Sequence, residues 1–205
     1  MLRVYKMTIL LVVALLMCAL PAAAAEFSAD MLINAGAKQM TSKMFTKGDK
    51  QRVEINTPGG KMINIIDLKT GKMFSLMPAQ KMYIAHEGMD DATLKQIKQF
   101  RSGKTPDNAK KIGSEKVAGY STDIYQVDDP KSGKIKLWYA PKLQYPLKSE
   151  GQGPMGKHSM QLTNIKEGGV SDDLFQVPAG YKKFSMPKGM PGGKMPGGMG
   201  GMKGQ

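Results

Sequence analysis

Hydrophobic and polar residues alternate from Gln39 to Glu87, and turn signals break this stretch into five short segments. The signals are KGDK at 47–50, TPGG at 57–60, KTGK at 69–72 and MPAQK at 77–81. Each contains the glycine or proline that a tight hairpin requires. Alternation with a period of two is typical of half-buried β-strands. We therefore expect an antiparallel meander of five strands.

The turn lengths also predict which residues face each other across the strands. With two residues at each tip, Met44 lies opposite Val53, Ile55 opposite Met62, Leu68 opposite Met73, and Met77 opposite Met82. Because strand side chains point alternately to the two faces, this register gathers one methionine-rich face, here called the inner face. Its members are Met40, Ser42, Met44, Val53, Ile55, Met62, Asn64, Ile66, Leu68, Met73, Ser75, Met77, Met82, Ile84 and His86.

The methionines of the inner face have two interpretations. Thioether side chains adapt to irregular shapes, so the face can form a deformable binding surface, but methionine also fills gaps in ordinary cores. The opposite face of segments three to five is apolar as well, with Ile63, Ile65, Phe74, Leu76 and Tyr83. Another part of the chain must cover this second face.

The period changes after Glu87. Asp90 and Asp91 are candidate N-caps, and Leu94, Ile97 and Phe100 follow at a spacing of three. This spacing predicts a short amphipathic helix that ends near Gly103. The helix is the candidate lid over the inner face.

Strand patterns resume in the second half of the chain. We expect strands at 111–117, 120–127, 134–140, 145–149 and 158–165, and Ile135, Leu137 and Tyr139 share one face of the third. The segment DDLFQVPAGY at 172–181 places Leu174, Phe175 and Val177 as an apolar plug. The expected fold class is mainly β with one short helix.

The first 25 residues have the pattern of a secretory signal peptide. Basic Arg3 and Lys6 precede an apolar run at 7–20 and a stretch of small residues that ends at Ala25. Met17 stands before Cys18 where lipoprotein processing requires a small residue, so we expect cleavage before Glu26, without lipidation, and a periplasmic product. The product then has no cysteine, and it folds without disulfides as one domain spanning 26–184.

The chain has 30 basic and 17 acidic residues, so it is strongly basic. Removal of the signal peptide leaves 28 basic residues and a net charge of +11. Such a charge favours anionic partners, and contact with an anionic membrane surface is one prediction. The lysines are spread over turns with no aromatic stacking platform, which argues against nucleic acid. We expect a monomer.

The sequence contains no motif that predicts catalysis. His86 and His158 are the only histidines, and they belong to no H-E-x-x-H or H-x-E pattern. Lys69, Thr70 and Gly71 form a K-T-G triplet, but no S-D-N accompanies it. We therefore expect a non-enzymatic protein without a cofactor.

Residues 185–205 are rich in methionine, glycine, proline and lysine, and this composition predicts a disordered tail. Its methionines are Met186, Met190, Met195, Met199 and Met202. Thioethers are soft ligands that select Cu(I). Periplasmic copper binding by this tail is therefore the alternative function.

Two segments carry a resemblance to a known family: KIKLWYAPKLQYPLKSE at 134–150 and LFQVPAGY at 174–181. With the signal peptide and the sheet interrupted by one helix, they resemble exported bacterial proteins of unknown function related to the outer-membrane lipoprotein carrier, LolA-like, superfamily. The resemblance implies an antiparallel unclosed β-barrel, a half-barrel, with a helical lid over an apolar cavity. It also implies a carrier for lipid or acyl chains. The inner-face and helix residues that we expect to bind such a ligand are Met44, Ile55, Met62, Ile66, Met73, Met77, Met82, Ile84, Leu94 and Ile97.

Overall fold

The computed structural model describes residues 25–86, 88–129, 133–153 and 156–184. Twelve strands form a single sheet in the order β12-β6-β5-β4-β3-β2-β1-β11-β10-β9-β8-β7. The strands of the first half are β1 (Glu26–Ala35), β2 (Lys38–Lys47), β3 (Lys50–Thr57), β4 (Gly60–Asp67), β5 (Met73–Met77) and β6 (Met82–His86). Those of the second half are β7 (Ala109–Val117), β8 (Tyr120–Asp129), β9 (Gly133–Ala140), β10 (Tyr145–Gly153), β11 (Gly156–Glu167) and β12 (Lys182–Lys183).

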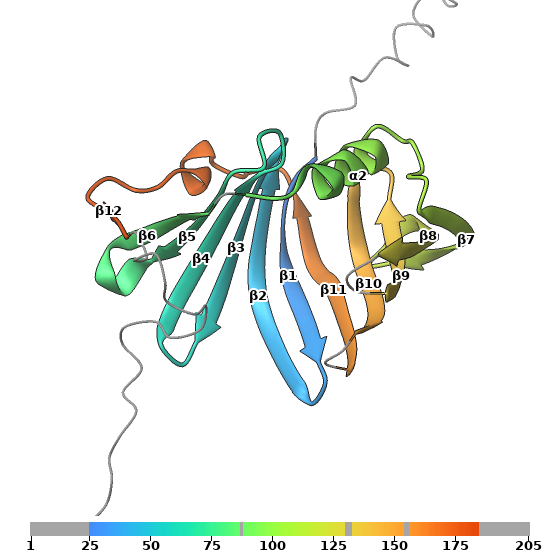
Figure 1. Ribbon diagram of the computed structural model, residues 1–205, viewed down its shortest axis with the longest axis horizontal. Helices are drawn as coiled ribbons and strands as arrows, with labels where there is room; N and C mark the ends of the chain where they lie inside the picture. The colour runs from blue at the N-terminus through green and yellow to red at the C-terminus, as the bar shows by residue number, and fades with distance from the viewer. Residues whose placement is uncertain (1–24, 87, 130–132, 154–155, 185–205) are drawn as a thin grey trace, which may run out of the picture.

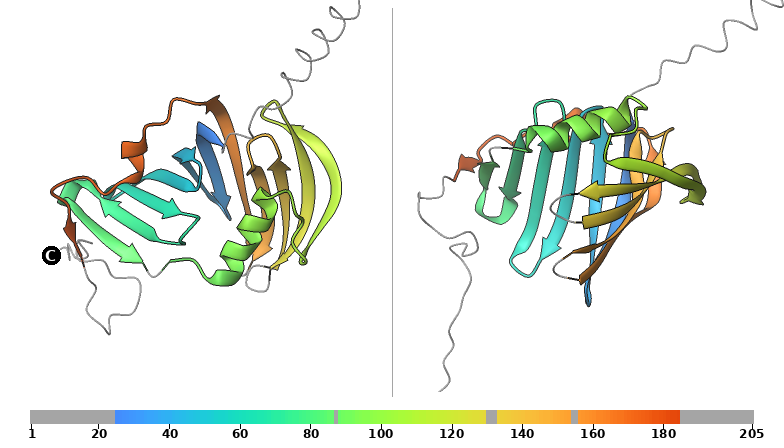
Figure 2. Two further views of the ribbon diagram at one scale, coloured as in Figure 1. Left: turned by 90° about the horizontal axis from the view of Figure 1, so that it is seen from above. Right: turned by 45° about the vertical axis from the view of Figure 1, so that its right-hand side comes forward.

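The sheet curls into a half-barrel that does not close (Figures 1 and 2). Neighbouring strands pair antiparallel, except that β12 runs parallel to β6. The α-helix α2 (Asp91–Arg101) lies across the concave side near one end, and two short 3₁₀ helices, η1 (Pro78–Gln80) and η2 (Asp172–Phe175), complete the elements. The predicted fold class, a mainly β half-barrel with one helix over it, is confirmed.

The predicted register is confirmed for three of the four pairs. Met44 pairs with Val53, Ile55 with Met62, and Met77 with Met82. The fourth pair is wrong, because Met73 lies opposite Ile66 and not Leu68. The Asp67 carboxylate accepts hydrogen bonds from the backbone N–H groups of Lys69 and Thr70, so the strand ends at Asp67 and the connection is longer than a two-residue turn. The register is shifted by two residues, and a shift of two leaves every side chain on its predicted face. The members of the inner face therefore do not change.

Helix α2 begins as predicted. The Asp90 side chain caps it by accepting a 2.9 Å hydrogen bond from the Thr93 backbone N–H. Leu94 and Phe100 are buried, while Lys95 and Lys98 are exposed. The helix therefore turns its apolar stripe toward the sheet. Within the described residues, no helix is long and apolar enough to cross a bilayer.

The C-terminal segment covers the outer face of the first half of the sheet. Val170 and Phe175 pack in one buried cluster with Ile63, Ile65 and Leu76, and Leu174, Val177 and Tyr181 flank it. The Arg52 guanidinium donates a 2.8 Å hydrogen bond to the Leu174 carbonyl and contacts Glu54. The predicted plug is thus present, and it covers the second apolar face of the sheet.

A second cluster of buried residues joins the two halves of the sheet. It lies around the junction of β1 with β2 and β11, where Phe27, Met44 and Leu162 are fully buried. Because β1 is the first strand and β11 the eleventh, this junction pairs the two ends of the domain. Residues that are far apart in the sequence therefore hold the centre of the half-barrel together.

Candidate functional site

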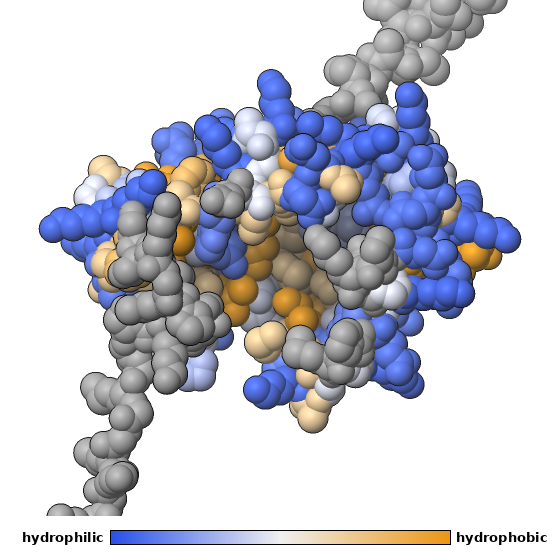
Figure 3. All heavy atoms as spheres, in the orientation of Figure 1, coloured by the Kyte–Doolittle hydropathy of each residue, from blue (hydrophilic) through white to orange (hydrophobic). Residues whose placement is uncertain are grey.

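An apolar cavity of about 350 Å³ lies between α2 and the concave side of β8, β9 and β10. Its lining residues are Gln51, Leu68, Met89, Gln96, Ile97, Phe100, Arg101, Val127, Ile135, Leu137, Tyr139, Gln144, Tyr145 and Pro146. The space-filling view shows apolar side chains in the hollow over the middle strands of the half-barrel, with polar side chains around it (Figure 3). The arrangement suits an apolar ligand better than a polar one.

Aromatic rings form one wall of the cavity. The Phe100 ring lies 5.2 Å from Tyr125 and 5.5 Å from Tyr139, measured between centroids. Phe100, Tyr139 and Val127 make a buried cluster that fixes the C-terminal half of α2 on the sheet. The Phe100 and Tyr125 rings are edge to face, a geometry that stabilises both rings beyond their burial. This wall is therefore the rigid side of the cavity.

Two tyrosines of the cavity wall lie in an environment of low polarity. Burial raises the pKa of Tyr139 to about 12, and the positive charge of Arg101 only partly opposes this. Burial also raises the pKa of Tyr145 to about 12, against a hydrogen bond with Gln51 that lowers it. Both hydroxyls are neutral at physiological pH, so these two tyrosines bring no charge into the cavity.

The cavity is closed on its α2 side by a few specific contacts. Arg101 donates 2.8 Å hydrogen bonds to the Asp49 carboxylate and to the Gly48 carbonyl, both in the turn between β2 and β3. At the other end of the helix, the Met89 backbone N–H donates to the Gly71 carbonyl. The helix is thus tied to two turns at one end of the half-barrel and can move only if these contacts break.

The residues predicted to bind ligand occupy four places. Ile97 lines the cavity, and Leu94 is buried where α2 packs on Gly71. Met44 and Ile84 are buried in the sheet. The other six lie half-buried on the same concave face, outside the cavity lining: Ile55, Met62, Ile66, Met73, Met77 and Met82. Their binding role stays a prediction.

A polar row interrupts the apolar inner face. Asn64, Ser75 and His86 lie on neighbouring strands β4, β5 and β6. The Ser75 hydroxyl donates to Asn64 Oδ1 at 2.7 Å and lies 2.8 Å from His86 Nε2. A serine that donates to an amide oxygen is not activated by the histidine, because its proton is committed elsewhere. The row offers polar contacts rather than a nucleophile.

Sequence reasoning missed most of the cavity lining. Leu137 and Tyr139 were expected on one strand face, and the structure places that face inward. The available signal was the alternation of Ile135, Leu137 and Tyr139, together with the aromatic Phe100 on the helix. No local pattern predicts that α2 packs against β9. The cavity can be located only when it is known how the strands of the two halves pair in the sheet.

The metal alternative falls outside the described residues, since Met186, Met190, Met195, Met199 and Met202 all belong to 185–205. Among the described residues, no group of three or more histidine, cysteine, aspartate or glutamate side chains could hold a metal ion. Copper binding stays a prediction about the tail alone. The signal peptide lies outside the described residues as well.

Comparison with known proteins gives a family and a set of similar folds. Residues 27–144 match the family described as Domain of unknown function (DUF4412), and no curated protein matches the chain. An uncharacterized conserved protein from Thermus thermophilus has a similar fold, with a TM-score of 0.56, 10% identity, and coverage of 80% of this chain and 91% of that chain.

Two further solved structures match less well. MucB in the MucA/MucB complex from Pseudomonas aeruginosa gives a TM-score of 0.49 at 17% identity, covering 77% of this chain and 57% of that chain. A LolA superfamily protein from Nitrosomonas europaea gives a TM-score of 0.35 at 10% identity, covering 76% of this chain and 91% of that chain. The match to DUF4412 confirms the predicted resemblance to a family of unknown function.

Proposed function

The chain belongs to the family described as Domain of unknown function (DUF4412), and we propose that it is a non-enzymatic periplasmic carrier that binds an acyl chain beneath α2. The observation that supports this most is the apolar cavity between the helix and β8 to β10. The predicted signal peptide and the resemblance of the sequence to LolA-like carriers agree with it.

The cavity size favours one acyl chain over a larger ligand. Pockets for small ligands span ~300–1,000 Å³, and at about 350 Å³ this cavity lies near the lower limit. Burial of each methylene group contributes ~0.8 kcal/mol, part of which offsets the cost of association. A lipid with two chains would have to extend from the cavity over the inner face, where Met73 and Met77 lie half-buried.

The polar row of Asn64, Ser75 and His86 orients the ligand, because it can hold a polar head group. Asn64 uses its amide oxygen to accept from Ser75. Its Nδ2 group donates to no other described residue, so it can donate to a ligand. Neighbouring strands are ~5 Å apart, so the row on β4 to β6 begins one strand from Gln51 of the cavity lining. A chain seated under α2 can therefore place a polar head group on this row.

Native mass spectrometry of the protein purified from the envelope of its own cells tests the proposed function. We expect a co-purifying species with the mass of a fatty acid or lipid, released on collisional activation. The same experiment would reveal bound copper. The carrier function is wrong if the protein carries no such species and also takes up no fluorescent fatty acid, phospholipid or apolar dye.

The head-group contact has its own test. Asn64→Leu should lower the affinity for a fluorescent fatty acid about tenfold, because a hydrogen bond to a charged group is lost. The same variant should bind the methyl ester of that acid as well as the unsubstituted protein does, or better. If Asn64→Leu weakens both ligands equally, the row does not hold the head group.

A further inference from the structure

One end of the half-barrel carries a net positive charge. In an antiparallel meander, every second turn lies at the same end of the sheet, so the β1–β2, β3–β4 and β5–β6 turns lie together. The start of β11 joins them, because Ala35 at the end of β1 pairs with His158 near the start of β11. These three turns and the start of β11 are here called the tip end, and α2 lies near the opposite end (Figure 1).

Each of the three turns and the start of β11 has one exposed lysine. They are Lys38, Lys61, Lys81 and Lys157. Lys182 and Lys183 add to them, because β12 starts beside the β5–β6 turn, where the Lys182 backbone N–H donates to the Lys81 carbonyl. The segments at 35–40, 56–62, 77–83 and 151–158 contain no acidic residue. Six lysines therefore share this end with two acidic residues, Asp128 and Asp129 at the end of β8, which the pairing of β8 with β9 and of β9 with β10 brings to the same end.

Few of these charges are neutralised. Lys61 pairs with Glu54. Within the described part of the chain, Lys38, Lys81 and Lys157 form no ion pair. At the opposite end, Arg101 pairs with Asp49 and Lys47 with Asp172, while Lys50, Lys69 and Lys95 form no ion pair among the described residues. The two ends differ in their acidic residues, because the opposite end also holds Asp49, Asp67, Asp90 and Asp91, so the net positive charge is concentrated at the tip end.

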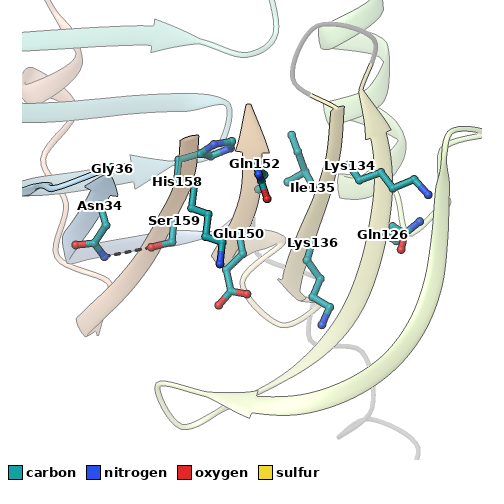
Figure 4. A pocket seen from close by; sticks show the side chains of 12 residues that line it. Asn34, Gly36, Gln126, Lys134, Ile135, Lys136, Glu150, Gln152, His158 and Ser159 are labelled. Atoms are coloured by element: carbon teal, nitrogen blue, oxygen red, sulfur yellow. Dashed lines mark hydrogen bonds between the residues drawn. The ribbon is translucent and has the colours of Figure 1, made fainter. Parts of the chain in front are cut away.

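A polar pocket of about 670 Å³ lies on the outer face of the sheet, next to the tip end (Figure 4). Lys134, Lys136 and Lys157 line it together with Glu150, the one carboxylate of the lining. The Glu150 carboxylate is 2.8 Å from Lys148 Nζ, so it is already paired. The pocket therefore presents three lysine side chains to an incoming anion.

We propose that the tip end is a docking surface for an anionic lipid bilayer. Flat arrays of phosphate groups match several lysines spread over separate turns, and each lysine near such a surface adds to binding. The helix lies near the other end of the concave side, so docking in this way leaves α2 and its contacts with the two opposite turns away from the lipid (Figure 2). The proposal rests on the charge distribution and not on the carrier function.

Vesicle binding tests the proposal with matched variants. The first combines Lys38→Gln, Lys81→Gln and Lys157→Gln at the tip end. The control combines Lys50→Gln, Lys69→Gln and Lys95→Gln, which are exposed lysines on the α2 side, so both variants lose the same charge. All are purified in the native processed form and sedimented with vesicles of phosphatidylcholine, with or without phosphatidylglycerol.

We expect the unsubstituted protein to bind only the vesicles that contain phosphatidylglycerol, and added salt to weaken this binding. Each lysine at a membrane surface changes partitioning about fivefold, so the tip-end variant should partition about a hundredfold less. The control variant should retain most of its binding. The proposal is overturned if both variants lose binding equally, if neither loses it, or if the unsubstituted protein binds no anionic vesicles.

A polarity-sensitive dye attached to a single introduced cysteine reports which end of the protein faces the vesicle. Gly59→Cys places the dye in the β3–β4 turn, where a side chain meets no backbone obstacle. Lys98→Cys places it on the exposed side of α2. Emission should shift to the blue with anionic vesicles for the first label and stay constant for the second. The reverse pattern would show that another surface meets the bilayer.

Discussion

The Arg101 guanidinium, in the last turn of α2, donates a 2.8 Å hydrogen bond to the Asp49 carboxylate in the turn between β2 and β3. A second bond of the same length reaches the Gly48 carbonyl. The Arg101 side chain is largely buried, with 16% exposed, so solvent screens this contact less than an ordinary surface ion pair. The pair holds the helix over the cavity.

Replacement of Arg101 by methionine should loosen α2. Loss of hydrogen bonds that involve charged groups costs about 1.5–3 kcal/mol, so uptake and release of a fluorescent fatty acid should both become roughly tenfold faster. Stopped-flow fluorescence measures both rates. Lys98→Met removes the same charge from the exposed side of the helix and should change neither. Equal rates in all three proteins would show that the helix does not control entry.

The connection into α2 should be intolerant of a side chain at Gly88. This residue has φ +103°, and an added Cβ would collide with the Gly71 carbonyl oxygen. Gly60 has a similar φ of +110° with open space around it. Gly88→Ala should therefore speed hydrogen exchange across 91–101, whereas Gly60→Ala should show only the backbone strain, about 1 kcal/mol of stability. The helix is not anchored here if the two variants exchange alike.

The plug on the outer face should be essential for stability. Phe175 is 7% exposed and packs against Ile63, Ile65 and Leu76. Phe175→Ala should lower the free energy of unfolding by about 3–5 kcal/mol, because it removes a buried ring and leaves a cavity. Urea denaturation measures the change. Gln176→Ala, at an exposed neighbouring position, serves as the control, and a loss below about 1 kcal/mol for Phe175→Ala would contradict the plug.

Stability should fall in alkaline solution. The pKa of Tyr139 is about 12 in the folded protein, whereas that of an unfolded tyrosine is about 10. A raised pKa stabilises the fold fully below pH ~10, and this contribution is lost as pH rises toward 12. Tyr139→Phe should therefore flatten the decrease in unfolding free energy over that window. If the variant and the unsubstituted protein decrease in parallel, Tyr139 is not buried as described.

The sequence predicts the first half of the fold well because its strands are joined by short turns. Alternation and turn chemistry fix the pairs Met44–Val53 and Met77–Met82 without any long-range information. The one error, at Met73, comes from the side chain of Asp67, which caps the following loop and lengthens it. A hydrogen bond of this kind is local, but the turn motif alone did not reveal it.

The cavity could not be predicted in the same way. Leu137 and Phe100 are far apart along the chain, and they line the same cavity only because β1 pairs with β11 and brings the second half of the sheet around. Eight of the ten predicted site residues came from β2 to β6, and the other two, Leu94 and Ile97, from α2. Of the ten, Ile97 alone lines the cavity. Local periodicity identifies an inner face. Which part of that face α2 covers depends on the pairing of β1 with β11 and on the curvature that the whole sheet then adopts.

Titration of a fluorescent fatty acid into a variant with a filled cavity tests the carrier function most directly. Leu137→Trp adds bulk inside the cavity lining, and Ile112→Trp adds the same ring at a position on β7 that is 46% exposed. We expect saturable binding by the unsubstituted protein and by Ile112→Trp. Leu137→Trp should bind about tenfold or more weakly, with its urea midpoint unchanged. Binding by Leu137→Trp equal to that of the unsubstituted protein would contradict a ligand site beneath α2.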